Sequence, residues 1–266
     1  MDAEELFKAG KLSDAVNFQL ATVKKNPTDT NARFFLAELS AFEGDWDRAD
    51  RQLDAIVQQS TGTPLLTLLF RQLIRAEIIR EQVFNEGRAP ELVVELDRES
   101  QLQLEMNTAL RLSQSSQYAQ LLESSKSMQA TVNGLCDDDQ AFTVIQDMDD
   151  RFRGVAEILT ASGKYFWVPW QNIQSAEFAK PERPMDLVWR KATIAIDGGP
   201  DGEIYMPVRY PNPNAWTDEE KLGRSTQWQE HSEVIVTGIG QRMILIEEEG
   251  VPIMEINRLS IESSKS

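Results

Sequence analysis

Cysteine and histidine are nearly absent, since the chain has one of each, Cys136 and His231. A lone cysteine excludes an internal disulfide and a zinc site made of thiolates, and it is typical of a reducing compartment. A lone histidine excludes histidine metal clusters and most catalytic triads within one chain. His231 lies beside Glu230 and near Glu233, so we expect a solvated loop residue rather than a general base. Cys136 precedes three aspartates, which disfavour its thiolate form and argue against a nucleophile.

Basic residues are also fewer than acidic residues. The chain has 27 lysines and arginines against 43 aspartates and glutamates, which gives a formal net charge of −16. Nucleic-acid affinity depends largely on cationic side chains that displace counterions, so we expect no nucleic-acid partner. A partner with basic segments fits this charge better. The alternative is that the excess carboxylates only keep the protein soluble, so the charge alone identifies no ligand.

A long uninterrupted apolar run is missing as well. The most apolar window, residues 65–84, contains three arginines and two glutamates, which a lipid-spanning helix would not tolerate. The first residues, MDAEELFKAGKLSDAV, lack the basic start and the apolar core of a signal peptide. We therefore expect a cytoplasmic protein without a membrane partner.

A short internal repeat is present near the N-terminus. Gly10-Lys-Leu-Ser-Asp-Ala15 recurs as Gly44-Asp-Trp-Asp-Arg-Ala49, 34 residues later, and 34 residues is the tetratricopeptide period. Glycine permits the turn between two helices, and the small alanine allows them to approach closely. The repeat predicts helices near 2–9, 13–25, 30–43 and 47–60, with residue 28, 29 or 30 capping the third. The alternative is two unrelated hairpins that share a short turn motif.

The sequence pattern changes after residue 62. Beyond residue 62 the repeat fails, and helices are predicted over 64–86, 90–113 and 117–133. From about 143 onward, short β-branched and aromatic runs predict strands at 165–168, 173–178, 187–196, 203–208, 234–237, 242–247 and 253–261. Hairpin turns are expected at 197–202 and at Glu249-Gly250, and a short helix near 217–223.

The fold class predicted from these elements is α + β with two domains. A tetratricopeptide-like α–α superhelix is expected over residues 1–135. A β-rich domain, either a small barrel or a curved antiparallel sheet, is expected over residues 143–262.

Acidic and glycine-rich segments supply no convincing reaction chemistry. The clusters at 137–139, 147–150 and 197–201 lack the spacing of a calcium loop, and we expect solvated linkers or turns. Gly238-Ile-Gly240 begins like a dinucleotide fingerprint, but Met243 stands where a small residue belongs and a strand is predicted to follow. We predict no catalytic residue, no metal and no cofactor.

A peptide-binding surface is the remaining candidate site. If the tetratricopeptide register holds, five side chains project from the first helices of the hairpins toward a concave groove: Phe7, Asn31, Phe34, Glu38 and Phe42. Partner peptides or helices commonly lie in such grooves. The alternative is that these phenylalanines fill contacts between neighbouring hairpins.

Five sequence blocks in the C-terminal half have a familiar order and spacing: YFWVPW at 165–170, PERPMDLVWR at 181–190, PVRYP at 207–211, STQW at 225–228 and GIGQRM at 238–243. From about 140 to 262, and together with the N-terminal helices, the chain resembles the ImpE family. Met185 and Lys191 depart from the family pattern, which favours arginine and proline there.

This resemblance implies a non-enzymatic accessory protein of the bacterial type VI secretion system, a contractile injection machine that is built and recycled in the cytoplasm. It implies binding of a helix from the small contractile-sheath subunit and assistance to the AAA+ ATPase that disassembles contracted sheath. Two other functions stay open, a generic tetratricopeptide co-chaperone, which needs a clamp of lysines and arginines, and a metal-dependent hydrolase that uses the acidic residues at 137–150.

The motif residues that the resemblance contributes are Trp167, Pro169, Asp186, Trp189, Arg190, Arg209, Tyr210, Trp228, Gly240, Gln241 and Arg242. We expect the tryptophans of these blocks, with Trp170, to pack the β-rich domain. The alternative role for the arginines at 190, 209 and 242 is a recognition surface, because guanidinium groups present several planar donors.

Overall fold

Two helical hairpins form the N-terminal end of the computed structural model, which describes residues 1–59, 62, 65–126, 131–137, 140–211, 216–233 and 235–262. The helices are α1 (Ala3–Lys8), α2 (Leu12–Lys25), α3 (Thr30–Glu43) and α4 (Trp46–Gln59), close to the predicted bounds. Gly10 and Gly44 both have positive φ at the turns, as the repeat requires. Asp29 caps α3 by accepting from Ala32 N at 3.0 Å. The tetratricopeptide superhelix itself stays a prediction.

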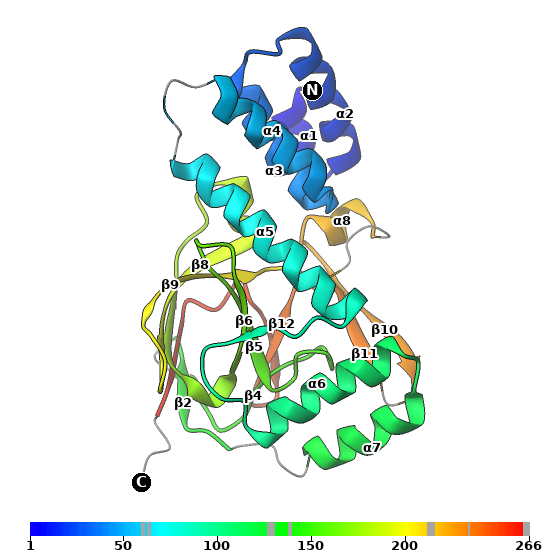
Figure 1. Cartoon of the computed structure of the whole chain (residues 1–266), viewed down its shortest axis with the longest axis vertical. Helices are drawn as coiled ribbons and strands as arrows, with labels where there is room; N and C mark the ends of the chain where they lie inside the picture. The colour runs from blue at the N-terminus through cyan, green and yellow to red at the C-terminus, as the bar shows by residue number, and fades with distance from the viewer. Residues whose placement is uncertain are drawn as a thin grey trace.

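A long helix, α5 (Leu65–Glu86), follows the hairpins and runs between them and the sheets (Figure 1). Next come α6 (Arg98–Arg111) and α7 (Ser115–Lys126). The helix predicted over 90–113 begins late, because residues 91–92 form strand β1 (Glu91–Leu92) and Asp97 caps α6 by accepting from Ser100 N. The helix predicted to Asn133 also ends early. Residues 131–133 are not helical and lead into a strand, and residues 127–130 lie outside the described part of the chain.

Most strands belong to one nine-stranded sheet with the order β1-β6-β5-β9-β8-β7-β14-β2-β3. Its neighbouring strands are antiparallel except β1 and β6, and its edge strands are β1 and β3. The sheet is therefore open, which matches the predicted antiparallel sheet and not the predicted small barrel. The remaining members are β2 (Gly134–Cys136), β3 (Gln140–Phe142), β5 (Val155–Leu159), β6 (Tyr165–Pro169), β7 (Ile173–Phe178), β8 (Trp189–Ile196), β9 (Gly202–Pro207) and β14 (Arg258–Ile261).

Two smaller sheets complete the β-rich part. β10 (Thr226–Ser232) pairs with β11 (Ile235–Gly240), and β12 (Met243–Ile246) lies between β4 (Ile145–Asp147) and β13 (Glu249–Pro252). β2, β3, β4, β5, β10 and β13 were not predicted, and the strand predicted over 253–261 is confined to β14. The predicted turn at 249–250 is wrong, because Glu247 has positive φ and the chain turns at 247–248. Val234, the predicted start of one strand, lies outside the described residues.

Three short helical segments connect the strands. They are the 3-10 turns η1 (Trp170–Asn172) and η2 (Pro184–Leu187), and the helix α8 (Asp218–Lys221) near its predicted place. η2 replaces the first residue of the strand predicted from 187, so that β8 begins at Trp189. The predicted turn at 197–202 joins β8 to β9 as expected.

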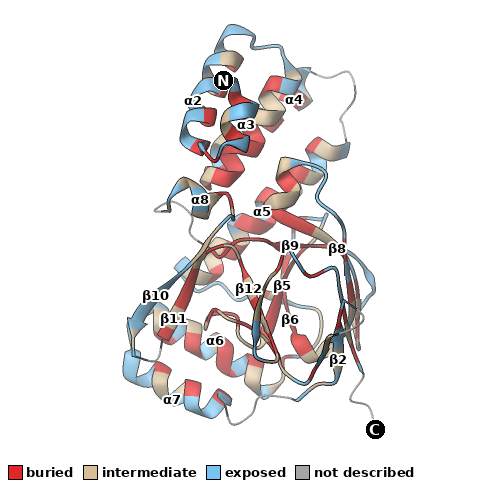
Figure 2. Ribbon diagram, turned by 180° about the vertical axis from the view of Figure 1, so that it is seen from behind, coloured by how far each residue is buried: buried red, intermediate tan, exposed pale blue. Residues whose placement is uncertain are grey.

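One hydrophobic core is shared by the hairpins, α5 and the large sheet. It includes Phe42 and Trp46 from the hairpins, Phe70 from α5, and Trp167 and Trp189 from the sheet. Figure 2 shows buried residues on α5 and on the parts of the hairpins and the sheet that face it. A second core lies within the β-rich part. Whether 1–135 and 143–262 are separate folding units stays a prediction. None of the described helices is long and apolar enough to cross a lipid bilayer.

Candidate partner-binding groove

A groove of about 580 Å³ opens between the hairpins, α5 and η2. Four of the five predicted binding residues, Phe7, Asn31, Phe34 and Glu38, line it. The side chains that were not predicted come from α1, α3, α4, α5 and η2 and include Phe35, Ile56, Leu66 and Pro184. Its size falls in the usual range for protein ligand sites, and its walls are mostly apolar.

The aromatic rings of the groove pack against one another or against α5, and Phe34 and Phe35 stay partly exposed. Phe34 is half-buried and its ring meets Phe70 at 5.7 Å between centroids. Phe7 meets the half-buried Phe35 at 6.2 Å. Both predicted roles, packing between helices and lining a groove, therefore apply to the same rings.

Phe42 does not line this groove, which corrects one predicted site residue. Its side chain is fully buried, and its ring packs against Phe7 at 5.2 Å and under the guanidinium of Arg209 at 5.5 Å. Arg209 also donates to the carbonyl oxygens of Phe42, at 2.6 Å, and Ala41, at 2.9 Å. The last turn of α3 faces the β-rich part, so Phe42 holds the two parts together.

Glu38 is a buried carboxylate in an apolar setting. Only 5% of its surface is exposed, and its Oε1 accepts from the Met185 N–H at a long 3.3 Å. Burial raises the pKa of Glu38 from 4.5 to about 7, while the Met185 N–H lowers it. Nearby Asp186 raises this pKa further and Arg183 lowers it, both with smaller effect.

Replacement of Glu38 by glutamine is expected to stabilise the protein at high pH only. Because the folded-state pKa lies above the ordinary value, the wild-type chain loses stability as the pH rises from about 4.5 to about 7. That difference corresponds to about 3 kcal/mol, at about 1.4 kcal/mol per pH unit. We expect equal free energies of unfolding near pH 4 and a gain of up to about 3 kcal/mol for E38Q at pH 8, measured by urea denaturation. A less stable E38Q at pH 8 would contradict this.

The family-motif residue Arg242 lies in a buried network of charges between α5 and the β-rich part. Its guanidinium is fully buried and pairs with Asp147 at 2.7 Å and with Glu157. Arg80 of α5 pairs with Glu157 at 2.7 Å and with Glu77 at 2.7 Å. Two arginines and three carboxylates thus pair with one another, and the network joins α5 to the β-rich part.

The two sheet carboxylates of the network titrate differently. Burial raises the pKa of Asp147 to about 7, although Arg242 lowers it. The pKa of Glu157 lies below its usual value. Burial acts to raise it, but the positive charges of Arg80 and Arg242 together have the larger effect. The prediction of a solvated acidic segment at 147–150 is wrong for Asp147 and Asp149, because both are buried and Asp149 pairs with Arg151 at 2.6 Å.

A recognition surface built from the three motif arginines is also excluded. Arg190, Arg209 and Arg242 are each at most 4% exposed. Arg190 donates to the carbonyl oxygens of Ile253 and Ile256, so its donors are used within the fold. These arginines hold loops and helices in place and leave no donor surface for a partner.

The other motif residues are mainly structural. Trp167, Trp170 and Trp189 are buried, whereas Trp228 is 39% exposed and lies against Tyr210. Pro169 ends β6, and Asp186 accepts hydrogen bonds from the N–H groups of Glu182 and Arg183. The Tyr210 hydroxyl lies 3.1 Å from the Asp147 carboxylate. Gly240 has positive φ, and Gln241 forms an isolated β-bridge with Arg209.

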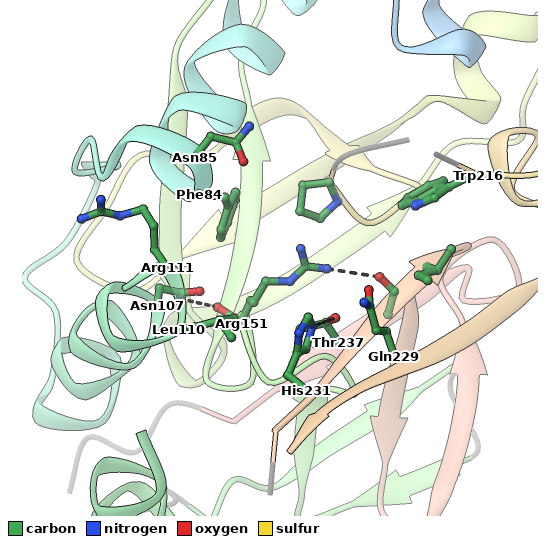
Figure 3. Close-up of a pocket in the computed structure, with 13 residues that line it drawn as sticks. Phe84, Asn85, Asn107, Leu110, Arg111, Arg151, Trp216, Gln229, His231 and Thr237 are labelled. Atoms are coloured by element: carbon green, nitrogen blue, oxygen red, sulfur yellow. Dashed lines mark hydrogen bonds between the residues drawn. The ribbon is translucent and has the colours of Figure 1, made fainter. Parts of the chain in front are cut away.

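A second cleft, of about 390 Å³, lies between α6 and the β10–β11 ribbon and contains His231 (Figure 3). His231 is exposed, and its Nε2 lies 2.8 Å from the Thr237 hydroxyl. Burial and then Arg151 lower the pKa of His231. Arg151 donates to Gly238 O at 3.2 Å, and Asn107 donates to Arg151 O at 2.8 Å. The polar groups of this cleft are thus largely occupied with one another.

The acidic clusters that sequence reasoning considered lie apart. Asp137 is exposed and accepts from the N–H groups of Asn257 and Arg258, and residues 138–139 lie outside the described range. Asp197 and Asp201 flank the turn between β8 and β9. In the described part of the chain, no three histidine, cysteine, aspartate or glutamate side chains come together as metal ligands would.

The fold and the groove define an α + β protein with an N-terminal helical part and a β-rich part, and residues 139–260 match the family model described as ImpE protein. The resemblance to the ImpE family is therefore confirmed. The chain is similar to the type VI secretion system accessory component TagJ of Pseudomonas aeruginosa, with 27% identity over 264 residues that cover 98% of this chain and 92% of that protein. It is also similar to the crystal structure of protein VPA1032 from Vibrio parahaemolyticus, with a TM-score of 0.91, 26% identity, and coverage of 98% and 97%.

Proposed function

We propose that this chain is a non-enzymatic cytoplasmic accessory protein of a type VI secretion system that binds the apolar face of a helix in the groove between its hairpins and α5. The bound helix belongs to the small contractile-sheath subunit, and binding assists the AAA+ ATPase that disassembles contracted sheath. The similarity to TagJ along nearly the whole chain supports the secretion-system role. The aromatic groove supports the binding mode and is the observation that carries it.

The shape and lining of the groove favour a helix over an extended acidic tail. Half-buried phenylalanines offer large apolar area at low conformational cost, and an amphipathic helix presents its apolar side chains along one face. An acidic tail needs cations, but Lys8 is the one lysine or arginine among the residues that line the groove, and it lies 3.8 Å from Glu4. The co-chaperone alternative is correspondingly weaker.

Titration of the full chain with synthetic peptides that cover each helix of the small sheath subunit tests this proposal. We expect one amphipathic peptide to bind with a Kd in the micromolar range or below. If no peptide of that subunit binds, and the intact subunit fails to co-elute with the chain, the proposal is wrong.

Replacement of Phe34 by alanine is expected to weaken this binding at least tenfold. Aromatic side chains in grooves commonly dominate the binding free energy, and Phe34 keeps an open side. Calorimetric titration measures the change, and circular dichroism melting checks the fold. Phe18→Ala on α2 is the matched control, because Phe18 is 44% exposed and does not line the groove. Equal affinities of the two variants would contradict the assignment of Phe34.

A further inference from the structure

Glu38 differs from the other buried carboxylates of the chain. Five carboxylates are buried among the described residues, and four of them pair with an arginine within 3 Å. These pairs are Glu77 and Glu157 with Arg80, Asp147 with Arg242, and Asp149 with Arg151. Glu38 forms no salt bridge with any described lysine or arginine, and it accepts a hydrogen bond from the backbone N–H of Met185 at 3.3 Å. An ionised carboxylate in such a place is costly unless a cation joins it.

A cation can approach the Glu38 carboxylate only from the groove. Glu38 lies on α3 and lines the groove, with Phe34 and Phe35 on the same helix. The charged groups around it are Glu4 and Lys8 at the end of the groove formed by α1, and Arg183 and Asp186 beside η2. The side chains that α4 and α5 contribute to the groove, such as Ile56, Leu66 and Thr67, carry no charge. The groove is therefore the open side of this carboxylate.

We propose that Glu38 is the specificity-determining residue of the groove and accepts a lysine or arginine from the apolar face of a bound amphipathic helix. This inference rests on the proposed function, because it needs a helix in the groove. The apolar side chains of that helix pack on Phe7, Phe34 and Phe35, and its basic side chain reaches between them to Glu38. A bound guanidinium or ammonium group supplies the cation that the fold supplies to the other four carboxylates.

The geometry of an α-helix fixes the spacing of basic and apolar residues in the bound helix. Residues three and four apart share one face, so the basic residue must have apolar residues one turn before and one turn after it. Ordinary amphipathic helices place basic residues on the opposite face. The recognised helix thus carries a single basic residue within its apolar stripe.

Two probe peptides test this inference. Both are 18-residue amphipathic helices with leucine one turn before and one turn after the central position, and they differ only in having lysine or methionine there. We expect the full chain to bind the lysine peptide at least tenfold more tightly at pH 8. This preference should fall below pH 7 as Glu38 takes up a proton, because its pKa is about 7. Fluorescence anisotropy of labelled peptides measures both affinities.

Glu38→Gln is the decisive variant. It keeps an oxygen acceptor for the Met185 N–H but has no charge, so we expect it to bind the lysine peptide no more tightly than the methionine peptide at every pH. Glu123→Gln on α7 is the matched control, since it makes the same change in net charge at a residue outside the groove, and it should keep the tenfold preference.

The outcomes separate this inference from the proposed function. If wild-type protein binds the two peptides equally well, or if E38Q keeps the lysine preference, the inference is wrong while the groove function stands. If neither probe binds and the sheath-subunit peptides also fail to bind, both are wrong. A circular dichroism melt of E38Q shows that its fold is kept, so a lost preference reports on binding.

Discussion

Arg242→Met is expected to destabilise the protein by about 3–5 kcal/mol, because it leaves two buried carboxylates with fewer cations. Asp147 loses its arginine partner, and Glu157 keeps only Arg80. The guanidinium also lies over the rings of Phe152, at 4.7 Å, and Tyr210, at 5.5 Å, and these contacts are lost as well. Urea denaturation followed by tryptophan fluorescence measures the free energy of unfolding.

Two further variants make this result specific. Arg258→Met removes an exposed arginine whose contact with Glu177 is 3.8 Å, and it should change stability by less than about 0.5 kcal/mol. Adding Asp147→Asn to Arg242→Met should recover part of the loss, because the carboxylate that lost its arginine partner then carries no charge. A loss below about 1 kcal/mol for Arg242→Met would show that the network does not matter for stability.

Trp189→Ala is expected to cost about 3–5 kcal/mol, the range for removing a large buried aromatic side chain. Trp189 is 1% exposed and its ring contacts Trp46 of α4 at 5.7 Å and Phe70 of α5 at 5.6 Å. Its Nε1–H donates to Glu77 at 2.9 Å, so the substitution also removes a donor from the charge network. Thermal unfolding followed by circular dichroism measures the loss.

The matched variant Trp189→Phe separates the two contributions. Phenylalanine keeps part of the ring contact but cannot donate to Glu77, so we expect a smaller loss, of about 1–3 kcal/mol. If the alanine and phenylalanine variants were equally stable, the contact between the hairpins and the sheet would not depend on this ring.

Local rules account for the part of the fold that the sequence predicts well. Gly10 and Gly44 turn the hairpins and Asp29 caps α3, and each acts within a few residues of its own position. The turn between β8 and β9 is local in the same sense. The short strands β1 and β4 were missed because their pairing depends on residues elsewhere, and two or three residues carry too little periodicity to detect.

Burial of charge was the main feature that the sequence did not predict. Asp147 and Glu157 resemble solvated acidic residues until their arginines are known, and Arg242 follows Asp147 by 95 positions while Arg80 precedes Glu157 by 77. The one available signal was the presence of Glu77 and Arg80, three apart, inside the most apolar helix. Phe42 was misplaced for the same reason, since Arg209 covers it from 167 positions away.

The shared core around α5 has a consequence for how the chain would present a bound helix. Aromatic packing and hydrogen bonds to the end of α3 join the hairpins to the β-rich part, and paired charges join α5 to the sheet. The groove is therefore fixed in angle relative to the β-rich part instead of being carried on a hinge. A helix bound in the groove is therefore held in one orientation relative to the β-rich part. When a second protein binds the complex, little further rotational entropy of that helix is lost.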